Sequence, residues 1–107
     1  MTAAQTPATD QEKLVGPVVR GFDPSIVDAV IEAAYADNPD ADIVIDDHAG
    51  YVRIHAPRFL RITRASLETA AGQEFPLHSL EPALVGFAGR IRYLGDDELY
   101  FYLDREE

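Results

Sequence analysis

The sequence has 107 residues, 47% of them hydrophobic, so it is long and apolar enough to fold as one domain around a single modest core. Its net charge of −10 disfavours binding to nucleic acids and to anionic membrane surfaces, which attract basic proteins. It contains no cysteine, which excludes thiol and disulfide chemistry and makes a reducing cytoplasm the expected compartment. We expect no signal peptide and no membrane span, because no apolar run has the required length.

The N-terminal third predicts a tail, a strand and a helix. Residues 1–13 are polar and show no hydrophobic periodicity, so we expect a flexible N-terminal tail before a domain spanning residues 14–107. The apolar stretch Leu14–Arg20 contains a proline, whose missing N–H group predicts a strand start or a strand at a sheet edge. From Pro24 onwards apolar residues recur every three or four positions, which predicts an amphipathic helix that ends before Pro39.

Three short runs of β-branched and aromatic residues follow, and we predict that they form a meander of three antiparallel strands. The runs are Ile43–Ile45, Tyr51–Ile54 and Phe59–Ile62. Alternate residues of a strand share a face, so one face of this sheet is expected to pack on the core while the other is wetter. The expected core-facing set is Val52, Ile54, Ala56, Leu60 and Ile62, and the wetter set is Tyr51, Arg53, His55, Phe59, Arg61 and Thr63.

The C-terminal part predicts two shorter helices. The first begins between Thr63 and Ser66 and is ended by Gly72. The second is expected over Leu80–Val85, with the segment Gly86–Gly89 breaking it.

The chain closes with a predicted hairpin of residues 90–94 and 98–103 around a Gly-Asp-Asp turn. Together these elements predict an α+β fold: a single domain with a mostly antiparallel sheet, two to three helices packed on it, and a flexible N-terminal tail.

The sequence offers no combination of residues that predicts catalysis or metal binding. His48 lies beside Asp46 and Asp47, but a metal site needs further ligands at fixed spacing. No glycine-rich segment carries the lysine of a P-loop, and no serine lies in a nucleophile elbow. We therefore expect no catalytic residue, no metal and no cofactor, and we interpret the chain as a binding or regulatory module.

Charge is distributed unevenly along the sequence. Residues 21–50 contain eight acids and no lysine or arginine, whereas residues 51–66 contain four arginines and no acid. A dipolar protein of this kind is suited to oriented docking on another protein. The alternative is that both segments are solvated faces that keep the protein soluble.

The chain resembles the effector, or coupling, proteins of soluble diiron monooxygenases in the order of its segments. These are the small regulatory components of toluene, alkene and phenol hydroxylating systems, and they are related to the regulatory component of soluble methane monooxygenase. The resemblance extends over nearly the whole domain and is carried by Val15–Arg20, a helix ending in Asp37-Asn38-Pro39, Tyr51–Ile54, Leu60–Arg64, and Phe87–Ile91 before a closing aromatic strand.

This resemblance implies a subunit with no cofactor and no catalytic residue of its own. Such proteins dock on the diiron hydroxylase, tune oxygen activation and substrate access, and couple NADH consumption to hydroxylation or epoxidation. The implied partner is the hydroxylase, with a functional link to the reductase and, in systems that have one, to a Rieske ferredoxin. A small-ligand-sensing allosteric domain is the alternative, because helices over an antiparallel sheet recur in such modules.

A docking surface is predicted from the composition of protein interfaces, which favour arginine and aromatic residues over lysine. The sequence contains eight arginines and one lysine. The predicted partner-binding residues are Val15, Val19, Arg20, Tyr51, Arg53, His55, Arg58, Phe59, Arg61 and Arg64. We expect them to meet an acidic surface of the hydroxylase, with the alternative that the arginines only balance the acidic helix.

Overall fold

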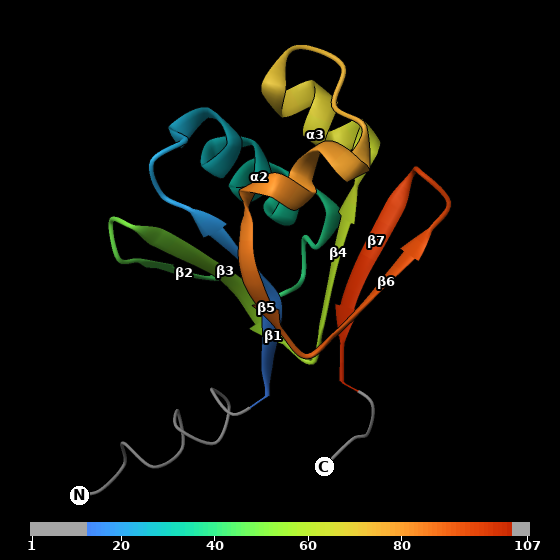
Figure 1. Ribbon diagram of the computed structural model, residues 1–107. Coiled ribbons are helices and arrows are strands. Elements are labelled where there is room, and N and C mark those ends of the chain that lie inside the picture. Colours follow the sequence, from blue (N-terminus) through green and yellow to red (C-terminus); the bar gives the residue numbers. More distant parts are fainter. Residues whose placement is uncertain (1–12, 104–107) are drawn as a thin grey trace, which may run out of the picture.

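The computed structural model describes residues 13–103, so all but the last residue of the predicted tail lies outside the described residues. Within that range the chain forms three helices and seven strands, which confirms the predicted α+β class (Figure 1). The elements are β1 (Leu14–Arg20), α2 (Pro24–Asp37), β2 (Val44–Asp47), β3 (Tyr51–Pro57), β4 (Phe59–Thr63), α3 (Arg64–Ala71), the 3₁₀-helix η1 (Leu77–Ala83), β5 (Leu84–Ala88), β6 (Arg90–Leu94) and β7 (Glu98–Tyr102).

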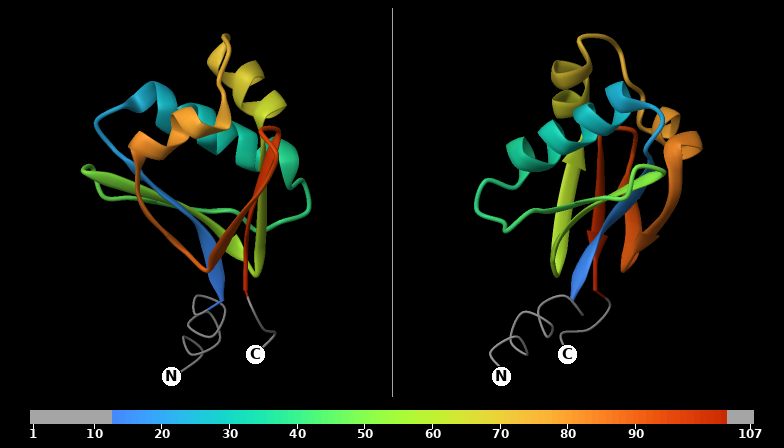
Figure 2. Two further views of the ribbon diagram at one scale, coloured as in Figure 1. Left: turned by 45° about the vertical axis from the view of Figure 1, so that its right-hand side comes forward. Right: turned by 90° about the vertical axis from the view of Figure 1, so that its left-hand side faces the viewer.

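The strands form two antiparallel sheets, one with the order β2-β3-β1-β5 and one with the order β4-β7-β6. The sheets diverge from a shared lower end like the arms of a V, and α2 lies between the arms (Figures 1 and 2). The predicted three-stranded meander is wrong, because β3 pairs with β2 and β1 whereas β4 pairs with β7. Between β3 and β4, Arg58 adopts a φ of 71°, and this corner directs the chain into the second sheet.

The inner faces of the two sheets and one side of α2 enclose the core. Ile54, Leu60 and Phe101 are fully buried there, as the alternation along each strand predicts. The apolar stripe of α2 is buried as well, at Val27, Val30, Ala34 and their neighbours. Fully burying a side chain as large as Ile54, Leu60 or Phe101 contributes about 1.5–3 kcal/mol.

The predicted position of β1 at a sheet edge is wrong, because β1 lies between β3 and β5. Pro17 is accommodated in this central strand beside an irregularity, a shift in the pairing of β1 with β5 between Val18 and Val19. Gly16 also has to be glycine: its φ is 145°, and a Cβ atom there would lie 2.2 Å from the Ile54 carbonyl oxygen.

The ends of α3 are determined by local sequence signals, whereas the ends of η1 differ from the predicted bounds. Thr63 caps α3 by accepting a hydrogen bond from the Ser66 N–H group at 3.1 Å, and Gly72 ends it with a φ of 74°. The third predicted helix exists as η1, but its predicted bounds, Leu80–Val85, are wrong, because η1 spans Leu77–Ala83 and the next five residues form β5. The segment interpreted as a break is therefore mostly strand. The C-terminal hairpin, β6 with β7, is confirmed.

The two sheets meet where the β3–β4 and β5–β6 turns lie together, which we call the apex. The Arg58 N–H group donates to the Lys13 carbonyl at 2.8 Å, which joins the β3–β4 turn to the start of β1. Gly89, between β5 and β6, has a φ of 84°, and a Cβ atom there would lie 2.8 Å from the Tyr102 carbonyl oxygen. Close backbone packing thus brings four chain segments to one end of the molecule.

Candidate partner-binding surface

Three of the ten predicted partner-binding residues lie inside the protein. Val15 and Val19 are fully buried on the core side of β1, and His55 is only 6% exposed. Their prediction as surface contacts is wrong, because β1 is a central strand and because Gly16 has no side chain to hold the imidazole away from the backbone: a Cβ atom at Gly16 would lie 2.9 Å from His55 Cδ2. The other seven reach the surface, but on different faces.

The outer face of the first sheet carries Arg20, Tyr51 and Arg53. Arg20 and Tyr51 are neighbours across β1 and β3, and the Arg53 guanidinium lies 5.1 Å from the Tyr51 ring centroid. Asp46 Oδ2 accepts from Arg53 Nη1 at 3.3 Å and lies 3.0 Å from His48 Nε2. Hydrogen bonding to His48 and attraction to Arg53 lower the pKa of Asp46. Arg53 is therefore partly neutralised within its own sheet.

His55 faces a hollow of about 340 Å³ on this outer face, which Leu14, Arg53 and Ala88 help to line. Its Nε2 atom has no hydrogen-bond partner within the described residues. Burial, and then repulsion by Arg53, lower the pKa of His55, so the imidazole is neutral at pH 7.

The outer face of the second sheet is more apolar and aromatic. Phe59 is 46% exposed, and its ring centroid lies 5.3 Å from that of Tyr100. With Arg92, Leu94 and Tyr102 these two residues line an open hollow of about 520 Å³. Of the five residues that line this hollow, only Phe59 was among the predicted partner-binding residues. The alternation along the closing hairpin could have indicated Arg92, Leu94, Tyr100 and Tyr102, because it places them on one face. The register places Tyr100 beside both Arg61 and Arg92.

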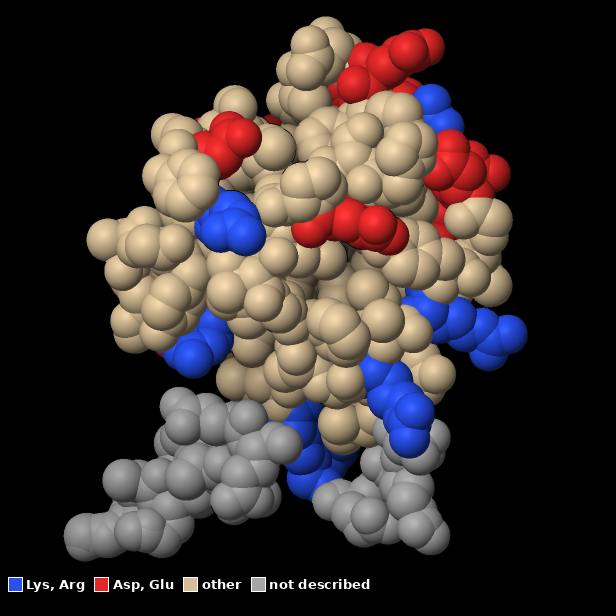
Figure 3. Space-filling model, in the orientation of Figure 1, with Lys and Arg blue, Asp and Glu red and all other residues tan. Residues whose placement is uncertain are grey.

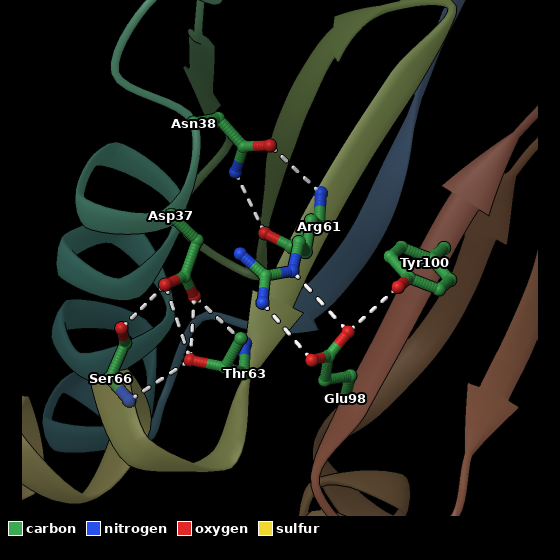
Figure 4. A network of polar contacts seen from close by, with 7 residues as sticks. All are labelled: Asp37, Asn38, Arg61, Thr63, Ser66, Glu98 and Tyr100. Carbon is green, nitrogen blue, oxygen red and sulfur yellow. Dashed lines mark hydrogen bonds and ion pairs between the residues drawn. The ribbon is translucent and has the colours of Figure 1, made fainter.

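Arg61 and Arg64 are held by carboxylates of their own chain. Arg61 Nη2 lies 3.0 Å from Glu98 Oε2, and Tyr100 donates its hydroxyl hydrogen to Glu98 Oε1 at 2.7 Å (Figure 4). Hydrogen bonds from Arg61 and Tyr100 lower the pKa of Glu98. Arg64 pairs with Glu68 at 2.8 Å and with Asp96 at 2.5 Å. By contrast, Arg58 and Arg92 are exposed and have no ion-pair partner within residues 13–103.

The end of α2 is joined to β4 by a polar network (Figure 4). The Asp37 carboxylate accepts hydrogen bonds from the Thr63 N–H group at 2.8 Å and from the Ser66 hydroxyl at 2.6 Å. The Asn38 side chain accepts from the Arg61 N–H group at 3.0 Å and donates to the Arg61 carbonyl at 2.7 Å. These bonds satisfy backbone groups on the open side of β4, so this part of the second sheet is unsuited to pairing with another strand.

Basic and acidic groups are separated on the visible surface. Most lysine and arginine groups lie in the lower half of Figure 3, toward the apex, whereas the acidic groups lie around the helices and the β6–β7 turn above. Within residues 13–103 no group of three or more histidines, cysteines and acids is placed to hold a metal ion. None of the described helices is both long and apolar enough to cross a lipid bilayer.

The fold and its exposed chemistry thus define a small α+β binding protein, with exposed arginines and aromatic residues at the apex and on the outer face of the second sheet. The sequence model of the MmoB/DmpM family matches residues 13–102, and the chain belongs to this family.

Its relatives have regulatory roles. The chain is 44% identical over 91 residues to the effector subunit of the alkene monooxygenase system of Xanthobacter autotrophicus, with 85% of this chain and 87% of that protein covered. A chain from the structure of the phenol hydroxylase–regulatory protein complex matches at 26% identity with a TM-score of 0.69, covering 85% of this chain and 99% of that one. Regulatory protein B of soluble methane monooxygenase shares the fold, with a TM-score of 0.64 at 18% identity, and the chain covers 66% of its length.

Proposed function

We propose that this protein acts by docking on the hydroxylase component of an alkene or aromatic monooxygenase. As a MmoB/DmpM protein it is an effector, or regulatory, subunit of a multicomponent monooxygenase. The observation that carries the proposal is the 44% identity to an alkene monooxygenase effector subunit over most of both chains. The small-ligand-sensing alternative has no support among these relatives.

Bound to the hydroxylase, the protein tunes oxygen activation and substrate access and couples NADH consumption to product formation. It contributes no cofactor, and the reductase, with a Rieske ferredoxin where one is present, supplies the electrons. The cytoplasm is the expected compartment, because a cysteine-free chain suits a reducing environment.

The apex is the proposed docking end. Arg58 and Phe59, from the predicted set, are exposed there, and Tyr102 lies beside Phe59 in the register of β4 with β7. Arginine next to exposed aromatic rings is the composition of interface centres. The acidic helices at the opposite end would be repelled by an acidic hydroxylase surface, so charge orients the encounter with the apex first (Figure 3).

The proposal is tested by adding the purified protein to the cognate hydroxylase and following complex formation by calorimetry. We expect a saturable complex, and we expect its affinity to fall with added salt because the docking end is cationic. Absence of binding at any salt concentration would refute the docking proposal.

A further inference from the structure

The two sheets present four edge strands, and three of them are protected against pairing with other chains. β2 ends in Asp46 and Asp47, and β6 carries Arg90 and Arg92. β4 is occupied by the Asn38 side chain, which bonds both backbone groups of Arg61. Charged residues and occupied backbone groups are the usual means by which proteins block sheet edges.

Among residues 13–103 nothing gives the fourth edge, β5, such protection. It pairs with β1 on one side only, and its five residues include no charge and no proline. Its large apolar side chains are partly exposed: Val85 is 55% exposed, and Phe87 is 46% exposed although its ring centroid lies 6.1 Å from that of the buried Phe101. An open, uncharged edge with exposed apolar residues is a hazard for aggregation unless a partner covers it.

The two ends of β5 carry cations. Arg20 Nε donates a hydrogen bond to the Pro82 carbonyl at 3.1 Å, which places the guanidinium just before the strand begins. The same guanidinium lies 5.9 Å from the ring centroid of Phe22, a residue 76% exposed. Arg90 follows the strand by two residues and is exposed. In Figure 3 an uncharged area lies between basic groups in the lower half of the molecule.

We propose that the open edge of β5 is a hydroxylase-binding element. The complementary surface is apolar opposite Val85 and Phe87, offers hydrogen-bonding groups to the free backbone edge, and carries carboxylates opposite Arg20 and Arg90. This inference rests on the proposed function and adds a specific element to it. Because β5 leads into the apex, a single partner surface can contact both the β5 edge and the apex.

Two matched substitutions test it. Val85→Lys places a charge on the β5 edge, and Val44→Lys places the same charge on β2, the opposite edge of the same sheet, where the valine is 39% exposed. Both should fold, as judged by thermal unfolding, because lysine is tolerated on exposed edge strands. We expect Val85→Lys to weaken binding to the hydroxylase by about tenfold or more and Val44→Lys by less than about twofold.

Amide hydrogen exchange of the unsubstituted protein gives a second readout that needs no variant. Exchange at β5 should be fast in the free protein and slowed in the hydroxylase complex, whereas exchange at β2 should be similar in both. Equal effects of the two lysine substitutions, or unchanged exchange at β5 in a saturated complex, would overturn the inference. If the unsubstituted protein forms no complex at all, the proposed function fails instead, so the two failures are distinguishable.

Discussion

The Asn38 side chain forms hydrogen bonds with β4 that the backbone of a neighbouring strand would otherwise form. Its amide group bonds both backbone groups of Arg61 and also donates to the Ala34 carbonyl at 2.8 Å. We predict that Asn38→Ala lowers the free energy of unfolding by about 1–3 kcal/mol, because these backbone groups lose their partners. Urea unfolding monitored by circular dichroism measures this, and Asn38→Asp should cost at least as much, because a carboxylate keeps the acceptor but cannot donate to the Ala34 and Arg61 carbonyls. A loss below about 0.5 kcal/mol would contradict the structural role.

His55 predicts a pH dependence of stability. Its pKa in the folded protein lies below the ordinary value of 6.5, so the unfolded chain binds a proton more readily than the folded one. Stability should therefore fall as the pH decreases from about 6.5 toward the lowered pKa. This pH range lies above the range in which Glu68 and Glu98 are protonated and lose their contribution to stability, because their pKa values are lowered from 4.5.

The measurement is the melting temperature at pH 7 and pH 5.5. His55→Gln should flatten the decrease between these two values, whereas the same substitution at the exposed His78 should leave it unchanged. An unaltered decrease in the His55 variant would show that another group titrates in this range.

Strand β1 joins β3 to β5 and so holds the first sheet together, because it pairs on both sides. We predict that Gly16→Ala strongly destabilises or unfolds the protein, since its φ is 145° and the new Cβ atom would collide with the Ile54 carbonyl. Gly86→Ala in the neighbouring strand β5 is the control, because no atom lies within 4 Å of a Cβ atom there. Comparable melting temperatures for the two variants would refute this account of β1.

Local patterns predicted most elements but not their pairing. The stripe of α2, the cap and glycine stop of α3 and the final hairpin depend on neighbours in sequence, and each is found where it was expected. By contrast, β4 pairs with β7 and β1 pairs with β5, which are distant in sequence. β5 was missed because its apolar run has two possible interpretations, as strand or helix, until its pairing with β1 is known.

The predicted partner-binding residues lie on separate faces for the same reason, because strand pairing is not determined by local sequence. Alternation correctly places Tyr51 and Arg53 on one outer face and Phe59 and Arg61 on another, but it does not show that β3 and β4 belong to different sheets. Burial of His55 depends on Gly16, a residue of another strand. Ion pairing of Arg61 likewise depends on Glu98, far along the chain. Such contacts follow from topology, not from local sequence.

For the whole molecule, charge polarity predicts which end meets the hydroxylase. Arg58→Ala at the apex should weaken binding, by about 2 kcal/mol if the guanidinium becomes desolvated in the complex, and should reduce the salt dependence of association. Asp28→Ala and Glu32→Ala, at exposed positions of α2, serve as controls and should leave affinity unchanged or improve it. Weaker binding in the α2 variants with intact binding of Arg58→Ala would place the docking face on the helices.

We propose that this protein regulates a monooxygenase reaction that another subunit catalyses. The most direct measurement is product formed per NADH consumed by the cognate hydroxylase and reductase, while the protein is titrated from zero to excess over hydroxylase. We predict that this ratio rises and reaches a plateau as the hydroxylase becomes saturated. A ratio and a turnover rate that stay constant across the titration would contradict it.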